Sequence, residues 1–503
     1  MPAPPNIPTI WVSIPYGMSA RNTLRSDIFK ILKARARLVI LTPLFADAEF
    51  SKEFGGGNVV LCDLPKNTSL LYRGFRRLLD IIEGYYFTRK TKIETLLILE
   101  KSLRAERPDL YWIRVTIGTI LGGSATVLRL LQCMQWWFAT TGYFDSLRQK
   151  YPPNLVFVTH ALALEEFTVA HMARRFGAAV VAMIHSWDNI TAKTGMRTAV
   201  GLNPGRMLPL EFDRVIVWNE IQRQELEQFY RYPRERILVT GVPQFDRYVN
   251  HEYPERVTFM RRIAGDPAKR VILFAAASAM MMPVHRQKEI VDQLVKALRN
   301  DEFSQSSQLL IRWHPGLDLS MWETKLAGVP GVLFQRPSPA FSACRLTSGW
   351  KIGESDEIHL AETLRHSDVV VNFCSTMAID ASMMGKPVVC IGFDGHETVP
   401  YLESVAKWYD YTHYRPIVES GGARIARSPD ELIPYINAYL TDPNRDAEGR
   451  KVIVEKLCYR RDGRAGARIG EMVAAFAEQS MAARSSEVTH QPSPGKVCSH
   501  AVS

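Results

Sequence analysis

The sequence has few cysteines, and they lack the spacing that metal sites and disulfide frameworks require. Seven of its 503 residues are cysteine, and none forms a CxxC pair. Zinc sites need clustered cysteines and histidines, and small secreted domains need paired cysteines. We therefore expect reduced core thiols in a cytoplasmic protein, with no structural zinc, no metal at the functional site and no cofactor.

Long hydrophobic runs are also missing. The most apolar window, residues 115–128, lies between Arg114 and Arg129 and is shorter than the roughly 20 residues of a spanning helix. The N-terminal stretch MPAPPNIPTIWVSI lacks the charged and then apolar segments of a secretory signal. We expect neither a membrane span nor a signal peptide.

Several common signatures are absent as well. The chain contains no GxGxxG, GxxxxGK[ST], HExxH or GxSxG motif. DNA-reading motifs are missing too, so we expect no nucleic-acid partner. The net charge of +10 by itself fits a phosphorylated substrate, a lipid headgroup or a nucleic acid, and charge alone does not choose among these.

What the sequence does contain is a long alternation of buried-strand runs and helical patterns, typical of doubly wound parallel sheets. We predict an α/β protein with two Rossmann-like domains facing a cleft. The N-terminal, acceptor-side domain is predicted at 1–245 with a helical insertion at about 66–150, the C-terminal, donor-binding domain at 246–483, and a disordered tail at 484–503.

The stretch from Asp368 to Gly395 is a predicted β-α-β unit. Ser375 and Thr376 stand where its helix begins, at the carboxyl end of a parallel strand. Free backbone N–H groups, hydroxyls and the helix dipole meet there, which suits a phosphate. A simple helix cap is the alternative interpretation.

Three further sets of residues in the second domain are candidate donor-binding groups. Arg312 and His314 end the strand at 309–313 and, by strand alternation, share one face toward a diphosphate. Ser278 follows a run of alanines that lets a ligand approach the backbone. Asp380 and Glu357 are candidates for ribose, sugar or base contacts, although each also fits ordinary helix chemistry.

In the first domain, polar residues crowd the exit of the strand at 179–184, in the segment HSWDNITAKTG. His185 or Asp188 is the candidate base for an acceptor hydroxyl. Asn189 and Lys193 are acceptor-side candidates, and His160 is a lesser one on the neighbouring strand. A hydrogen-bonded loop anchored by a tryptophan is the structural alternative.

Residues 72–90 of the insertion combine basic and aromatic side chains in the pattern YRGFRRLL followed by YYFTRK. Such a segment is compatible with contact to an anionic membrane at the inner face, and equally with a solvated basic face over a buried aromatic one.

These motifs together resemble the GT-B glycosyltransferases, and within them the CDP-glycerol glycerophosphotransferase-related enzymes of bacterial surface polymers. The resemblance rests on LLIRWHP (309–315), SDVVVNFCSTMAIDASMMGKPVVCIGF (367–393) and DGRA (462–465). It implies that His314, Ser375 and Thr376 hold the donor phosphates and that His185 is the base. The family's usual acceptor loop reads HGTPLK, whereas this chain has HSWDNITAK.

We therefore expect a metal-independent glycosyltransferase of surface polysaccharide biosynthesis. It would move a sugar from a nucleotide-diphosphate donor, UDP- or CDP-linked, to a hydroxyl of a glycan or lipid-linked acceptor. A CDP-glycerol-type polyol-phosphate transferase is the alternative enzyme, and a non-catalytic anion- or membrane-binding scaffold is the alternative of another class.

Overall fold

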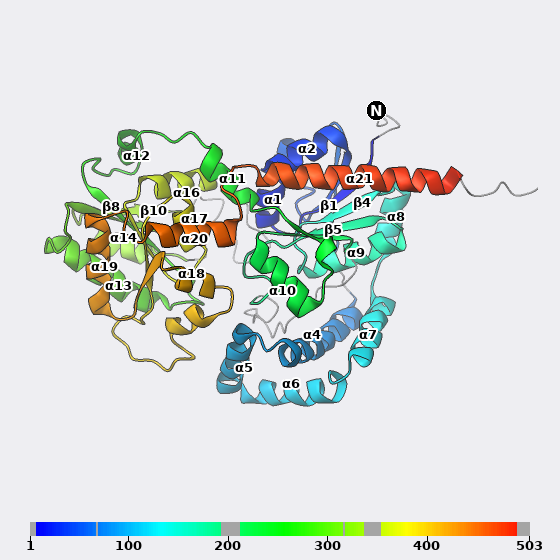
Figure 1. Cartoon of the computed structure of the whole chain (residues 1–503), viewed down its shortest axis with the longest axis horizontal. Coiled ribbons are helices and arrows are strands. Elements are labelled where there is room, and N and C mark those ends of the chain that lie inside the picture. The colour runs from blue at the N-terminus through cyan, green and yellow to red at the C-terminus, as the bar shows by residue number, and fades with distance from the viewer. Residues whose placement is uncertain (1–6, 67–68, 193–211, 315–316, 337–353, 490–503) are drawn as a thin grey trace, which may run out of the picture.

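The computed structural model describes residues 7–66, 69–192, 212–314, 317–336 and 354–489. Its described part contains two parallel sheets, of seven and six strands, each flanked by helices (Figure 1). The strand order is β3-β2-β1-β4-β5-β6-β7 in the first sheet and β10-β9-β8-β11-β12-β13 in the second. Both orders are doubly wound, so the predicted α/β class is confirmed.

The strands of the first sheet are short, and all except the edge strands β3 and β7 are buried on both faces, as the β-branched runs predict. They are β1 (Thr9–Ser13), β2 (Arg37–Leu41), β3 (Val59–Cys62), β4 (Leu155–Val158), β5 (Ala179–Met183), β6 (Arg214–Val217) and β7 (Ile237–Val239). The helices of this domain are α1 (Gly17–Leu24), α2 (Asp27–Arg35), α3 (Ala48–Phe54), α8 (Gly142–Lys150), α9 (Leu164–Arg175), α10 (Glu220–Tyr230) and α11 (Pro243–Asn250).

The second sheet repeats the scheme. Its strands are β8 (Arg270–Ala275), β9 (Ser307–Arg312), β10 (Val332–Gln335), β11 (Val369–Asn372), β12 (Val388–Ile391) and β13 (Ala423–Ala426). Its helices are α12 (Arg256–Arg262), α13 (Val284–Arg299), α14 (Ser320–Leu326), α16 (Glu354–His366), α17 (Met377–Met383), α18 (Arg415–Ser420), α19 (Pro429–Thr441) and α20 (Ala447–Cys458).

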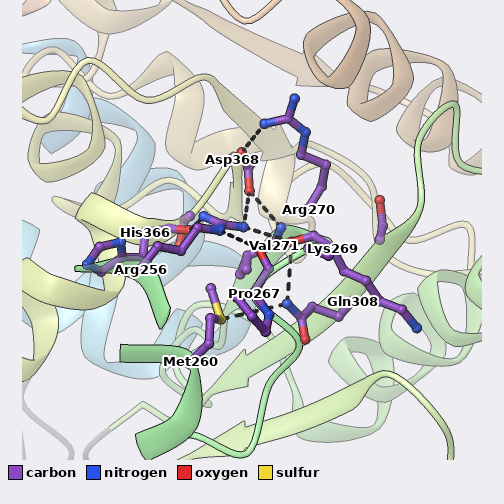
Figure 2. Close-up of polar contacts among 12 residues, drawn as sticks. Arg256, Met260, Pro267, Lys269, Arg270, Val271, Gln308, His366 and Asp368 are labelled. Carbon is purple, nitrogen blue, oxygen red and sulfur yellow. Dashed lines mark hydrogen bonds and ion pairs between the residues drawn. The ribbon is translucent and has the colours of Figure 1, made fainter. Parts of the chain in front are cut away.

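A polar network fastens the amino ends of the central strands of this second sheet (Figure 2). The Asp368 carboxylate accepts from the Val271 backbone N–H at 2.8 Å and pairs with Arg256 and Arg270 at 3.0 Å each. Arg256 also donates to the His366 carbonyl at 2.7 Å. The network holds β8 against β11 at their amino-terminal ends. It therefore does not occupy the carboxyl-terminal ends, where ligands of such sheets bind.

Between β3 and β4 the chain leaves the sheet and forms a layer of helices along the lower edge of Figure 1. This layer comprises α4 (Leu70–Thr91), α5 (Glu94–Glu106), α6 (Pro108–Leu121), α7 (Ala125–Met134) and the 3-10 turn η1 (Gln135–Phe138). Phe87 of α4, Leu96 of α5 and Ile93 between the two helices join the core of the first domain. The helices α6 and α7 pack on α4 instead, outside that core.

The last helix, α21 (Ala465–Thr489), belongs to the first domain rather than to the second, where the sequence placed residues 465–483. Its side chains Ile469, Val473 and Ala477 are fully buried in a core that includes residues of β1 and α2. Figure 1 shows the helix running past α2. Asp246 of α11 accepts from the backbone N–H groups of Ala465 and Gly466 at 3.0 and 2.7 Å. These bonds hold the start of α21 against α11 of the first domain. The helix also continues to Thr489, past the start of the predicted tail at 484.

Candidate functional site

Two cavities lie where the carboxyl ends of the two sheets face each other, with volumes of about 340 and 250 Å³. The larger is walled mainly by the second domain, and the smaller reaches His185 of the first domain. Both are lined by the same five side chains: Arg21, Glu357, Leu360, Thr376 and Asp380. The cavities are therefore adjacent, with residues of both domains in their common wall.

Arg312 and His314 both line the larger cavity, as does Trp313 between them. Arg312 donates to the Gln335 side chain of the neighbouring strand β10. Burial lowers the pKa of Arg312 to about 10, so the guanidinium stays positive at neutral pH. Burial also lowers the pKa of His314, which makes this imidazole a neutral hydrogen-bond donor rather than a cation.

The corner between β11 and α17 places Ser375 and Thr376 in the same cavity. The Ser375 hydroxyl accepts from the Met377 N–H at 3.3 Å, so part of its role is to cap the short helix. Thr376 makes no such cap, and its hydroxyl instead accepts from the Trp187 indole N–H at 3.2 Å. This bond joins the predicted phosphate corner to the predicted acceptor loop.

Ser278 also lines the larger cavity, beside Ala275, Ala276 and Ala277. The turn after β8 is closed by the Ser278 carbonyl, which accepts from the Met281 and Met282 N–H groups at 3.0 and 3.1 Å. The small side chains leave the backbone of this corner open to the cavity, which is the feature that the sequence suggested.

Asp380 and Glu357 lie in the common wall, each held by a group from outside the second sheet. The Asp380 carboxylate accepts from the Tyr248 hydroxyl at 2.8 Å, and burial raises its pKa to about 6 despite that bond. Glu357 pairs with Arg247 at 3.0 Å and with Arg21 at 3.6 Å. Glu357 is thus the centre of an ion cluster that links α16 to α1 and α11.

Sequence reasoning missed Arg21, Arg247 and Tyr248. Arg21 stands in the first helix, far from any strand end in the chain, and residues 243–254 carry the other two in a segment interpreted only as a domain boundary. The boundary segment forms α11, whose side chains enter the smaller cavity. The mixture of aromatic and charged residues in this segment was the sequence feature that could have pointed to Arg247 and Tyr248 as site residues.

His185 is 4 % exposed, yet it lines the smaller cavity together with Thr376 and Asp380. Its ring stacks on that of His160, with centroids 4.9 Å apart, and Tyr16 meets His160 edge-on at 5.5 Å. The buried carboxylate of Glu166 accepts from the backbone N–H groups of Thr159 and His160, at 3.1 and 2.7 Å. Burial raises the pKa of Glu166 to about 8.

The remaining acceptor-side candidates have other surroundings. Asn189 is buried and accepts from the Ser186 N–H at 2.5 Å, which closes its own loop. Asp188 stands near Cys374, whose thiol pKa is raised by burial and additionally by the Asp188 charge. Neither residue is among the described residues that line the two cavities. Lys193 lies outside the described residues.

The basic segment 72–90 is only partly on the surface. Arg73, Arg77 and Lys90 are exposed, but Arg76 is 4 % exposed and forms ion pairs with Asp80 and Glu83. Arg76 also donates to the Gln135 side chain at 2.9 Å. Arg76 therefore does not belong to the exposed basic surface of this segment, because it is buried and ion-paired inside the helical layer.

Within the described ranges, no group of three or more His, Cys, Asp or Glu side chains is arranged as a metal site. No single helix of that part of the chain has the length and apolar character of a membrane span, although α6 and residues 125–138 reach them together across a 101° bend.

The chain belongs to the CDP-glycerol:poly(glycerophosphate) glycerophosphotransferase family, whose model matches residues 116–475. It is therefore a transferase, as predicted. No curated protein matches the chain.

Solved structures share the fold at low identity. The wall teichoic acid polymerase TagF is 13 % identical with a TM-score of 0.51, covering 94 % of this chain and 90 % of its own. A UDP-N-acetylglucosamine 2-epimerase described from Listeria monocytogenes is 13 % identical with a TM-score of 0.51, covering 98 % and 100 %. The epimerase of Methanocaldococcus jannaschii is 12 % identical with a TM-score of 0.50, covering 93 % and 99 %. The predicted GT-B architecture is confirmed.

Proposed function

We propose that the paired cavities bind a nucleotide-diphosphate donor and an acceptor hydroxyl, and that the protein transfers the activated group between them. The observation that carries this proposal is the shared wall: Thr376 and Asp380 face both the cavity of His314 and the cavity of His185. A donor held at the first corner can therefore present its reactive atom to the second.

In this mechanism His185 takes the proton of the acceptor hydroxyl as the oxygen attacks. The new bond forms between that oxygen and the transferred group, and the bond from this group to the donor phosphate breaks. Arg312 contributes a positive charge, and His314, Ser375 and Thr376 contribute neutral hydrogen-bond donors, to the leaving phosphate. Asp188 is the weaker candidate base, because it stands near Cys374 rather than in the cavity lining.

The nature of the transferred group separates two forms of the proposal. In the first, a sugar passes from a UDP- or CDP-linked donor to a surface glycan or lipid-linked acceptor, as the altered acceptor loop HSWDNITAK favours. In the second, a polyol phosphate passes from a CDP-linked donor, as the family description favours. The carboxylates of Glu357 and Asp380 suit the hydroxyls of either group, which both forms require.

The leaving group distinguishes these two forms directly. Sugar transfer releases a nucleoside diphosphate, whereas polyol-phosphate transfer cleaves within the diphosphate and releases a nucleoside monophosphate. We would first screen UDP- and CDP-linked donors by thermal shift, since a bound ligand stabilises the folded state. Chromatography of the nucleotide released during turnover then identifies the reaction.

The residue roles are tested by His185→Ala and His314→Ala. We expect each to lower turnover by about a hundredfold or more while the protein stays folded, and we expect only His314→Ala to weaken donor binding strongly. His285→Ala is the matched control, because His285 is exposed on α13 away from both cavities. Unchanged turnover in both site variants would contradict the assignment.

Reaction at a lipid-linked acceptor would place the protein at the inner face of a membrane, and the basic segment 72–90 is the contact that the sequence suggested. The exposed side chains that support this contact are Arg73, Arg77 and Lys90. As a purely electrostatic contact it would be released by several-hundred-millimolar salt. The non-catalytic scaffold is the less favoured alternative, because the family consists of transferases by its description.

A further inference from the structure

Trp187 belongs to the acceptor-side loop of the first domain, but its side chain packs against the second domain. It stands two residues after His185, and it is only 6 % exposed. Its indole shares a hydrophobic cluster with Ala378 and Tyr414 of the second domain. The ring meets that of His413 edge-on at 4.8 Å and lies 5.6 Å from that of Tyr414. The second domain therefore fixes the position of the indole.

The backbone around Trp187 is held by the first domain. The Ser186 carbonyl accepts from the Gln222 side chain at 3.0 Å, and the Ile190 carbonyl accepts from the Tyr230 hydroxyl at 3.0 Å. Both donors belong to α10 and are buried, so breaking these bonds would leave buried polar groups unsatisfied. Ring and backbone are thus both fixed, and the indole N–H keeps one direction.

That N–H donates to the Thr376 hydroxyl at 3.2 Å. A threonine hydroxyl has one proton and two lone pairs, so this bond occupies a lone pair and leaves the proton to be donated elsewhere. Thr376 does not cap its own helix, and within the described ranges the indole is the only hydrogen-bond partner of its side chain. Thr376 lines both cavities, so a ligand there can accept this proton.

We propose that Trp187 is a positioning residue for donor binding, because its N–H holds the Thr376 hydroxyl in the orientation that donates to the donor phosphate. This inference rests on the proposed function and adds the residue that prepares one of its phosphate contacts. A hydroxyl already oriented needs no rearrangement when the ligand binds, and such preorganisation raises affinity.

Trp187 is also a position at which this loop, HSWDNITAK, departs from the usual HGTPLK of the family. The family motif therefore does not predict this bond. Because Trp187 lies two residues from His185, the same side chain that prepares the phosphate contact also ties the loop of the candidate base to the donor corner.

The test is calorimetric titration of the full chain with UDP and with CDP at neutral pH, using the nucleotide that the wild type binds more tightly. Trp187→Phe keeps an aromatic ring beside His413 and Tyr414 but removes the N–H. We expect it to raise the dissociation constant about threefold to tenfold, as the loss of one hydrogen bond does. Thr376→Val should raise it by at least as much, because it removes the hydroxyl itself.

The double variant separates orientation of the hydroxyl from packing of the ring. In the Thr376→Val background, Trp187→Phe should change the dissociation constant by less than about twofold, since no hydroxyl is left to orient. If Trp187→Phe causes the same loss in both backgrounds, Trp187 acts through packing alone and the proposal is overturned.

Trp11→Phe is the matched control. Trp11 is fully buried, its indole N–H donates to the Tyr151 carbonyl at 2.9 Å, and neither residue lines a cavity. This variant should leave nucleotide affinity within about twofold of the wild type. A Trp187→Phe variant that binds as tightly as the wild type would overturn this inference and leave the proposed function standing. A folded wild type that binds neither UDP nor CDP would overturn both.

Discussion

At the scale of single residues, the site depends on how burial changes acid–base behaviour. His314 and Arg312 sit at one strand end, and burial lowers the pKa of both, but only the guanidinium remains charged at neutral pH. Asp380 shifts in the opposite direction, because burial disfavours its charged form. In the larger cavity Arg312 therefore keeps its positive charge, beside a carboxyl group of Asp380 whose pKa is about 6.

This titration predicts a pH dependence of donor binding. The pKa of Asp380 is about 6, so the carboxyl is mostly neutral below that pH, and above it the charged form would repel the diphosphate of the proposed donor. We expect donor affinity to fall about threefold to tenfold as the pH rises from about 5 to about 8. Activated donors suit this measurement, since both of their phosphates are esterified and do not titrate in this range.

Calorimetric titration of the wild type and of Asp380→Asn with an activated donor, across that pH range, measures how donor affinity depends on pH. The amide still accepts the Tyr248 hydrogen bond seen at 2.8 Å but carries no charge, so its affinity should vary little with pH. An Asp380→Asn variant with the same pH profile as the wild type would show that another group titrates.

At the scale of elements, α4 shows why a basic helix is not always a basic surface. Arg76 and Arg77 are neighbours in the sequence, but a step of one residue turns about 100° around the helix, and only Arg77 is exposed. Arg76 points into the layer toward Asp80, Glu83 and Gln135. Its removal would leave two buried carboxylates without their positive partner.

Arg76→Ala should therefore destabilise the protein by about 3–5 kcal/mol. Arg77→Ala, which changes the adjacent exposed arginine, should stay within about 0.5 kcal/mol of the wild type. Urea denaturation of both variants, followed by circular dichroism, measures the difference. Equal stabilities would mean that the Arg76 ion pairs contribute nothing beyond a surface contact.

At the scale of the whole molecule, α21 ties the end of the chain back to its beginning. It starts at the Asp246 cap in α11 and buries Ile469, Val473 and Ala477 against α2 and the first sheet. The first domain is thus completed only after the second has been synthesised. The segment of the second domain is therefore flanked in the sequence on both sides by segments of the first domain.

Ile469→Ala tests this arrangement. Ile469 is fully buried, so the cavity and the lost transfer energy should cost about 2–5 kcal/mol. Glu478→Ala in the same helix removes only a half-exposed pair with Arg35 and should cost about 1 kcal/mol or less. Chemical denaturation of the two variants measures both values. A small loss in Ile469→Ala would indicate that α21 is not part of the first core.

The sequence alone determined the two sheets and half of the site. β-branched runs separated by helical patterns predict buried parallel strands, and such strands bring their carboxyl ends to one edge. For that reason the sequence groups His314, Ser375 and Thr376 at the edge of one sheet and places His185 at the edge of the other.

The tertiary structure alone decided which distant segments meet. Arg21, Arg247 and Tyr248 reach the cavities from helices whose sequence pattern does not indicate a ligand site. Their ion pairs and hydrogen bonds are made with residues remote in the chain, and such partners cannot be read from the local sequence. The same holds for the burial of Arg76 and for the return of α21 to the first domain. Hydrophobic periodicity records which face of an element is covered, but not which element covers it.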